Sequence, residues 1–302
     1  MLTQIVESYL AIRRACGFKF KSGGKLLRSF AVFSDARDKH HVCSEIAIEW
    51  AGLGKSVNTC ARRLGHVIRF ARYVRAEDQS HELPPAVFGS EKRQRPTPYI
   101  FSPDNIQRLV KATSQSGRLS LRRQTYSTLF ALLACTGLRV SEAIRLRFDD
   151  ITPDGLVIRC SKFRKSRLVP LHETAHAGLE RYLRQRRPYA PFDDHIFVSL
   201  RRKPLLLDDV ETAFRTAIDK IGLQPRLGRT RPTPHSLRHT FAVRALEACP
   251  DDRDRITKHM LALSTYLGHS SVRDTYWYLE ATPDLMRNIS ECCERFTKGG
   301  KP

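Results

Sequence analysis

The chain has 302 residues, a length that favours about two domains, and 41% of its residues are hydrophobic. Its 52 Lys and Arg residues outnumber its 31 Asp and Glu residues, which gives a formal net charge of +21. This surplus favours a polyanionic partner, with nucleic acid first, because phosphates neutralised by basic side chains release condensed counterions.

Several other classes of protein are disfavoured by the same sequence. The longest apolar runs are far too short to span a bilayer, and the first 18 residues are interrupted by charges instead of forming a secretory core. The eight cysteines are scattered without a Cys-x-x-Cys pair, so we expect free thiols and no disulfide framework. A soluble protein of the cytoplasm, without a membrane partner, is the expectation.

Residues 1–80 are predicted to form a small helical domain. Apolar residues recur at helical spacing near its start, around Ile46 to Trp50, and again from Val57 to Val74. Its first 76 residues hold 14 Lys and Arg residues against 5 Asp and Glu residues. A basic helical domain of this kind is suited to contact a phosphate backbone.

Residues 81–97 are predicted to be a basic interdomain linker. The segment contains two consecutive prolines, a Gly-Ser pair and the basic residues Lys92, Arg93 and Arg95, without any periodicity. These three side chains are candidate DNA-binding residues in a strap that crosses the nucleic-acid backbone. An ordinary solvated loop is the alternative.

Residues 98–302 are predicted to form a second, mostly helical domain. A helix start is indicated at residues 102–104, where Ser can cap, Pro can take the first helical position and Asp complements the positive helix end. Gly137 is placed to end a later helix. Residues 156–160 and 167–171 are strand-like runs on either side of a basic turn, which predicts a hairpin. The predicted fold class is mainly α with a small antiparallel β-sheet (α+β).

A last helix is predicted at about residues 283–296, with apolar residues along one side. Such a helix either docks on another subunit or packs on its own domain, and the stripe alone does not distinguish the two.

Six polar residues in the second domain form a set suited to breaking a phosphodiester without a metal: Arg139, Lys162, His235, Arg238, His269 and Tyr278. His235 and Arg238 are three residues apart and therefore share one helix face. Arginine is the side chain best matched to phosphate oxygens, because its rigid fork of donors fits them. Each of these residues is commonplace alone, so the prediction depends on the set.

A zinc site is the alternative for the two nearby histidines. His235 and His239 are four residues apart, the spacing of two zinc ligands on a helix. Ser236 stands where a metalloprotease would carry its glutamate, and no acidic or cysteine third ligand is evident. No metal is expected.

Four sequence features occur together in the order of a known family: TGLRVSE at residues 136–142, HSLRHTF at 235–241, LGHS at 267–270, and Tyr278 nine residues after His269. In these features the chain resembles the tyrosine recombinase (phage integrase) family. The resemblance spans the whole second domain. It implies that residues 1–80 are a SAM-like DNA core-binding domain and that residues 98–302 are the catalytic domain.

The resemblance also implies how the residues would act on DNA. Arg139 and Arg238 would hold the non-bridging oxygens of the scissile phosphate, and His269 would donate a further hydrogen bond. Tyr278 would attack phosphorus, form a 3′-phosphotyrosyl link and release a 5′-hydroxyl. The energy of the phosphodiester is preserved in this link, so neither a metal nor a nucleotide cofactor is needed.

Proton transfer is assigned to two further residues on the same basis. Lys162 would be the general acid for the leaving oxygen, and His235 the general base or proton relay. Phe163 stands where the family usually has a glycine after this lysine. Lys165 therefore remains the alternative, although the register with the following strand favours Lys162.

Two other positions resemble supporting residues of the family. Glu142 would orient one of the active-site cations, with an exposed helix carboxylate as the alternative, and His239 is assigned as a second supporting residue. The interval of nine residues from His269 favours Tyr278 over Tyr276 as the nucleophile.

The implied partner is double-stranded DNA, with four protomers acting on two sites and a monomer or dimer before they meet. Accessory recombination proteins, a mobile genetic element and a location near the nucleoid fit the same interpretation. Two alternatives remain open: a type IB topoisomerase-like relaxing enzyme, and a catalytically idle DNA-binding relative.

Overall fold

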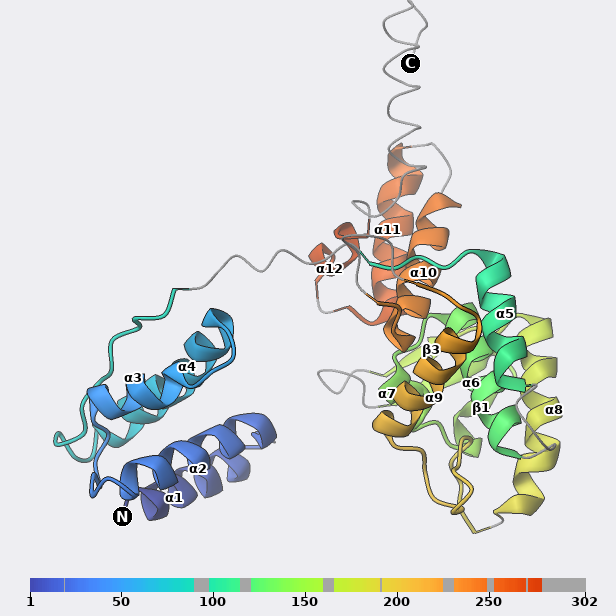
Figure 1. The fold of residues 1–302 in the computed structure, drawn as a ribbon. Helices are drawn as coiled ribbons and strands as arrows, with labels where there is room; N and C mark the ends of the chain where they lie inside the picture. Colours follow the sequence, from blue (N-terminus) through green and yellow to red (C-terminus); the bar gives the residue numbers. More distant parts are fainter. Residues whose placement is uncertain are drawn as a thin grey trace, which may run out of the picture. The chain divides into compact units, whose positions relative to one another are not determined.

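The computed structural model describes residues 1–18, 20–89, 98–114, 121–159, 166–190, 192–224, 231–248, 253–269 and 271–278. The chain divides into two compact units, Met1–Arg95 and Pro96–Pro302 (Figure 1). The basic residues Lys92, Arg93 and Arg95 and the predicted docking helix at 283–296 lie outside the described residues. Within the described part, no helix is both long and apolar enough to cross a membrane.

The first unit is a helical bundle, as the periodicity predicts. Its helices are α1 (Leu2–Ala15), α2 (Lys21–Asp35), α3 (Ser44–Gly52) and α4 (Val57–Val74). Large apolar side chains from all four helices fill its core, among them Leu10, Phe30, Trp50 and Phe70. Burial of these side chains is the main stabilising term.

Asp35, at the end of α2, fixes the start of α1. Its carboxylate accepts hydrogen bonds from the backbone N–H groups of Leu2 (2.8 Å) and Thr3 (3.0 Å). Burial alone would raise the pKa of Asp35, but hydrogen bonds from Thr3 and Leu2 outweigh it and lower that pKa to about 2. The carboxylate therefore caps the positive end of α1 while it is charged.

The second unit is also mainly helical. Its helices are α5 (Pro103–Ser114), α6 (Leu121–Thr136), α7 (Val140–Ala143), α8 (Glu173–Tyr189), α9 (Leu207–Lys220), α10 (Pro234–Glu247), α11 (Arg253–Leu267) and α12 (Arg273–Tyr276). The predicted start of α5 is found at Pro103, where the Ser102 hydroxyl accepts the Asn105 N–H at 3.1 Å. Buried α6 contacts α5, α8 and α10 and so forms the centre of this unit (Figure 1).

A small sheet completes the second unit. Its strands, β1 (Ile151–Thr152), β2 (Gly155–Ile158) and β3 (Arg167–Val169), are antiparallel in the order β1-β2-β3 and follow a short 3-10 turn, η1 (Phe148–Asp150). Val157 pairs with Leu168, and Ile158 pairs with Arg167. The predicted hairpin and the mainly α fold with a small antiparallel sheet are therefore confirmed. Lys162 and Lys165, which come between β2 and β3 in the sequence, lie outside the described residues.

Candidate active site

Arg139 is placed by the abrupt end of α6. Gly137 follows the last residue of α6 with a φ of +60°, a conformation that favours glycine. A Cβ atom on Gly137 would lie 2.5 Å from the Phe241 ring of α10, so the two helices approach closely here. The chain then turns, and Arg139 precedes the short helix α7.

Arg238 lies on α10 and is only 1% exposed. Its Nη1 donates to the Gly137 carbonyl and its Nη2 to the Leu267 carbonyl, both at 2.7 Å. Burial, followed by repulsion from Arg139, lowers the pKa of Arg238 to about 10, so the side chain stays charged at neutral pH. The guanidinium is thus a fixed positive charge.

Glu142 joins Arg139 to a second arginine, Arg167 of β3. Arg139 Nη1 donates to Glu142 Oε1 at 2.8 Å, and Arg167 donates to both Glu142 oxygens, at 3.1 and 2.8 Å. Burial alone would raise the pKa of Glu142, but Arg167 and then Arg139 outweigh it and lower that pKa to about 2. The alternative of an exposed helix carboxylate is wrong, because the Glu142 side chain is only 7% exposed.

His235 and His239 lie one turn apart on α10. Their rings meet edge to face, with centroids 4.5 Å apart. Loss of hydration, and after it the charges of Arg238 and Arg139, lower the pKa of His235. Burial, followed by the neighbouring His235, lowers the pKa of His239 to about 3. Both imidazoles are therefore neutral at pH 7 and able to accept a proton.

His269 follows the end of α11, where Gly268 adopts a φ of +66°. Its Nδ1 lies 2.8 Å from the hydroxyl oxygen of buried Thr275, on α12. Burial, followed by the charges of Arg238 and Arg139, lowers the pKa of His269 to about 4. The Thr275 contact occupies Nδ1 and leaves Nε2 as the ring nitrogen that is free to face a substrate.

Tyr278 packs among apolar side chains of α10 and α11 and is only 3% exposed. Its ring is stacked on His269 (6.1 Å between centroids) and tilted against His239 (5.4 Å). Burial raises the pKa of Tyr278, while the charges of Arg238 and Arg139 oppose this rise. The rival Tyr276 is 55% exposed and shares none of these ring contacts.

The structure therefore gathers most of the candidate set within the second unit. The residues brought together are Arg139, Glu142, His235, Arg238, His239, His269 and Tyr278. Two more residues of this cluster, Arg167 and Thr275, were not singled out from the sequence. An arginine at the start of a strand and a threonine in a short helix have no local pattern that marks them.

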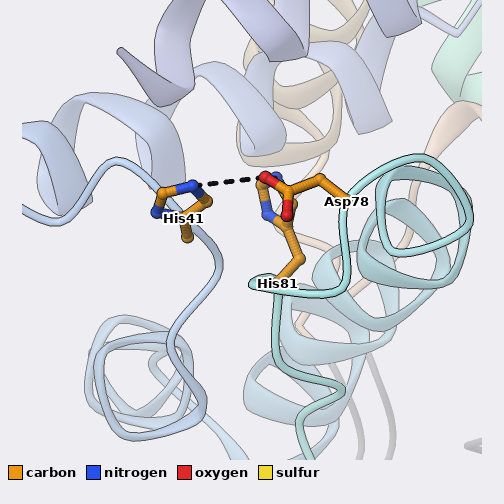
Figure 2. A group of neighbouring side chains, drawn as sticks. All are labelled: His41, Asp78 and His81. Carbon is orange, nitrogen blue, oxygen red and sulfur yellow. Dashed lines mark ion pairs between the residues drawn. The ribbon is translucent and has the colours of Figure 1, made fainter.

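Metal binding was considered for clusters of possible ligand residues. Within the described ranges, His235 and His239 have no third His, Cys, Asp or Glu ligand atom within reach. A different group in the first unit, His41, Asp78 and His81, brings three ligand atoms within 4.8 Å of one another (Figure 2).

The hydrogen bonds of this second group argue against a metal ion. The Val42 backbone N–H donates to His81 Nδ1 at 3.0 Å, so the proton of the neutral ring lies on Nε2. That nitrogen faces Asp78 Oδ2 at 4.0 Å and, while protonated, offers no lone pair to a cation. His41 Nε2 approaches the same oxygen at 3.3 Å. The group instead holds the segment after α2 against the segment after α4.

Comparison with known proteins identifies the family of the chain. The phage integrase family model matches residues 100–284, more than half of the chain. A Sinorhizobium fredii protein named as an integrase/recombinase (y4rB) is 36% identical over 97% of this chain and 96% of that protein. The tyrosine recombinase XerD of Listeria innocua is 26% identical over 78% of this chain and 76% of that protein.

Solved structures show the same fold. The Tn1549 transposon integrase in complex with a circular intermediate DNA aligns with a TM-score of 0.68 and 20% identity, over 96% of this chain and 99% of that chain. A lambda integrase tetramer bound to a Holliday junction aligns with a TM-score of 0.61 and 18% identity, over 89% of this chain and 77% of that chain. From the family match and the 36% identical relative, it follows that the chain belongs to the phage integrase family of tyrosine recombinases.

Proposed function

We propose that this chain is a site-specific DNA recombinase that cleaves and rejoins strands through a covalent bond between Tyr278 and a 3′ phosphate. One observation carries the proposal. A phenol, two fixed guanidinium groups and neutral histidines meet in one place, although they come from segments as far apart as residues 139 and 278.

Arg139 and Arg238 hold the two non-bridging oxygens of the scissile phosphate. Each guanidinium has five N–H donors, and backbone carbonyls and Glu142 already fix part of each fork. The donors that remain are oriented before DNA arrives, so they stabilise the charge that develops in the transition state without reorganisation. His269 adds a hydrogen bond from Nε2 when the Thr275 hydroxyl donates to its Nδ1.

Tyr278 is the nucleophile. A phenol with its ordinary pKa is only about a thousandth ionised at neutral pH, which costs roughly 4 kcal/mol for use as phenolate. Burial adds to this cost in the DNA-free protein, and Arg238 and Arg139 reduce it. His235 accepts the phenol proton or relays it, and His239 supports this role because its ring contacts those of both His235 and Tyr278.

Tyr278 Oη forms a bond to phosphorus, the bond from phosphorus to the 5′ oxygen breaks, and that oxygen takes a proton from Lys162. Lys162 is assigned from its position in the sequence between the residues of β2 and β3, and Lys165 is the alternative. A 5′-hydroxyl from another strand reverses the step, so strands are rejoined without a metal or nucleotide cofactor.

Duplex DNA is the proposed partner, and a tetramer on two DNA sites is the proposed working assembly, with monomers or dimers before synapsis. The net charge of +21 and the tetramer seen for lambda integrase on a Holliday junction support this. The DNA backbone would be contacted by residues 1–80 and by the basic residues Lys92, Arg93 and Arg95. Location at the nucleoid and assistance by accessory recombination proteins belong to the same proposal.

A trapping experiment tests the nucleophile. DNA ends bound covalently to the wild-type chain in cells are mapped to identify the site, and nicked suicide substrates are then built on it. We expect Tyr278→Phe to abolish covalent capture while DNA binding stays close to wild type, because only the attacking oxygen is lost.

The matched control is Tyr276→Phe, which removes the hydroxyl of an exposed neighbouring tyrosine and is expected to capture DNA normally. Continued capture by Tyr278→Phe would refute the assignment. Relaxation of supercoiled plasmids regardless of sequence would favour a topoisomerase-like activity instead.

A further inference from the structure

Three consecutive backbone carbonyls at the end of α11 each accept a hydrogen bond from a different arginine. Arg167 Nε donates to the Tyr266 carbonyl at 2.7 Å, and Arg238 Nη2 donates to the Leu267 carbonyl at 2.7 Å. Arg139 Nη2 donates to the Gly268 carbonyl at 3.0 Å. We call the carbonyls of residues 266–268 the carbonyl triad. These groups lie at the negative end of a helix, which attracts cations.

Arg167 is the one member of these three arginines to which the proposed chemistry gives no role. Its side chain is only 10% exposed. Its Nε is committed to the carbonyl triad, and its two Nη groups are committed to Glu142. Because each of its three guanidinium nitrogens already donates to a protein oxygen, Arg167 is placed to orient other groups and not to contact a phosphate itself.

Arg167 reaches the two flanks of the active site at once. Through Glu142 it fixes Arg139, whose Nη1 and backbone N–H bind the same carboxylate at 2.8 and 3.0 Å. It also packs beneath the turn before His269, since a Cβ atom on Gly268 would lie 2.8 Å from Arg167 Nη1. Its position therefore sets both the path of the chain into His269 and the phosphate clamp, which is our name for Arg139 and Arg238.

The location of Arg167 in the sheet connects these groups to the hairpin. Arg167 is the first residue of β3 and pairs with Ile158, the last residue of β2. The same residue thus anchors the hairpin to the end of α11. Loss of the guanidinium would free Glu142 on one side, and Arg139 would keep a carboxylate partner that is no longer held in place.

We propose that Arg167 is a positioning residue for strand transfer, which acts through Glu142 and the carbonyl triad on Arg139 and His269; this inference rests on the proposed function. A small displacement of the clamp is enough to slow the chemical step greatly, because catalysis depends on prior alignment. Binding of uncleaved DNA depends on many contacts and should change little.

The test measures single-turnover formation of the covalent complex on a nicked suicide substrate, built on the trapped DNA site, and the dissociation constant for the uncleaved duplex. Arg167→Met is expected to slow capture by about 100-fold with a nearly unchanged dissociation constant. Arg167→Lys should be intermediate, since an ammonium group reproduces only part of the fork. Arg147→Met is the matched control, because it removes an exposed ion pair with Asp194 elsewhere in the unit.

Two further measurements separate positioning from general damage to the fold. If Arg167 acts through Glu142, the double variant Arg167→Met with Glu142→Gln should lose no more rate than the worse single variant. A neutral methylphosphonate at the scissile position lowers the need for the arginine clamp, so the defect of Arg167→Met should shrink on it. A defect of the fold alone would persist on both substrates.

The possible results are distinct. If the wild-type chain captures no DNA, the proposed function fails. If the wild type captures DNA and a folded Arg167→Met captures it within twofold of the wild-type rate, the positioning role is refuted. The role is also refuted if the rate losses of Arg167→Met and Glu142→Gln add in the double variant. Thermal melting shows which variants are folded, and Arg167→Lys decides with the same readouts if the methionine variant is not.

Discussion

At the scale of single residues, Thr275 controls two members of the site from one position. Its hydroxyl contacts His269 Nδ1, and its carbonyl accepts the backbone N–H of Tyr278 at 3.0 Å. The residue is fully buried, so water does not replace these partners. The orientation of one imidazole and the start of the turn that carries the phenol are therefore coupled.

Removal of this hydroxyl should lower the rate without removing any group that touches DNA. We expect Thr275→Val to slow covalent capture by about tenfold, or roughly 1.4 kcal/mol, close to the net value of one hydrogen bond. The loss should be in the rate of the covalent step, because His269 no longer has a fixed tautomer. Thr275→Ser keeps the hydroxyl and should retain most of the activity, whereas a valine variant as fast as wild type would show that His269 is oriented otherwise.

At the scale of elements, the site is built at the ends of helices. Glycines with positive φ follow the last residues of α6 and α11, and Arg139 and His269 come directly after these turns. The chain can reverse direction within two residues there, which delivers both side chains to the same place. The glycines are thus structural requirements of the site.

Gly137→Ala tests this requirement through stability. A non-glycine residue in the left-handed region costs about 1–2 kcal/mol, and the new Cβ would also meet the Phe241 ring at 2.5 Å. We expect the melting temperature to fall by about 2–4 °C for each kcal/mol lost, measured by calorimetry on the full chain.

The matched control is Gly178→Ala in α8, where a Cβ would meet nothing within 4 Å. Alanine is the better helix former by about 0.8–1 kcal/mol, so this variant should be neutral or more stable. Equal melting temperatures for Gly137→Ala and wild type would mean that the turn tolerates a side chain.

Much of this arrangement could be predicted from the sequence, and the part that could not has a physical reason. Helical periodicity and the Gly137 stop signal depend on local spacing, so the helices and the hairpin are readable from neighbouring residues. The second partner of Glu142 is not, because Arg167 comes from a strand 25 residues away in the sequence. The tertiary packing decides which face of a short edge strand such as β3 is buried, and the neighbouring residues in the sequence do not indicate it.

At the scale of the whole molecule, acid should weaken both units through their histidines. The pKa is lowered for His66 and His81 in the first unit and for His235, His239 and His269 in the second, with loss of hydration as the first cause in every case. A partly buried imidazole stays neutral in the folded state and takes up a proton on unfolding, so acid favours the unfolded state.

The sign follows from the two pKa values of each group. In the unfolded chain these histidines titrate near 6.5, while His269 and His239 in the folded chain titrate at about 4 and about 3. Their contribution is complete above pH 6.5 and is lost as the pH falls toward 3–4. Asp35 and Glu142, with pKa values of about 2, weaken the fold in the same direction once the pH falls below about 5.

We therefore expect the free energy of unfolding to be nearly flat from pH 8 to 7 and to decrease from pH 6.5 to 4.5, as measured by denaturant titration at constant ionic strength. His239→Phe should reduce the slope, because it removes one proton taken up on unfolding. A wild-type stability that rises on acidification would contradict this account.

The carbonyl triad and the Glu142 carboxylate together offset the positive charge of the three arginines in the protein without DNA. The three guanidinium groups repel one another, and the carbonyl dipoles and Glu142 offset this repulsion while no DNA is bound. Because these hydrogen bonds are present without DNA, the three arginines keep their positions between one DNA-binding event and the next. On the proposed mechanism, the same arrangement of arginines would then serve each successive strand exchange without having to form again.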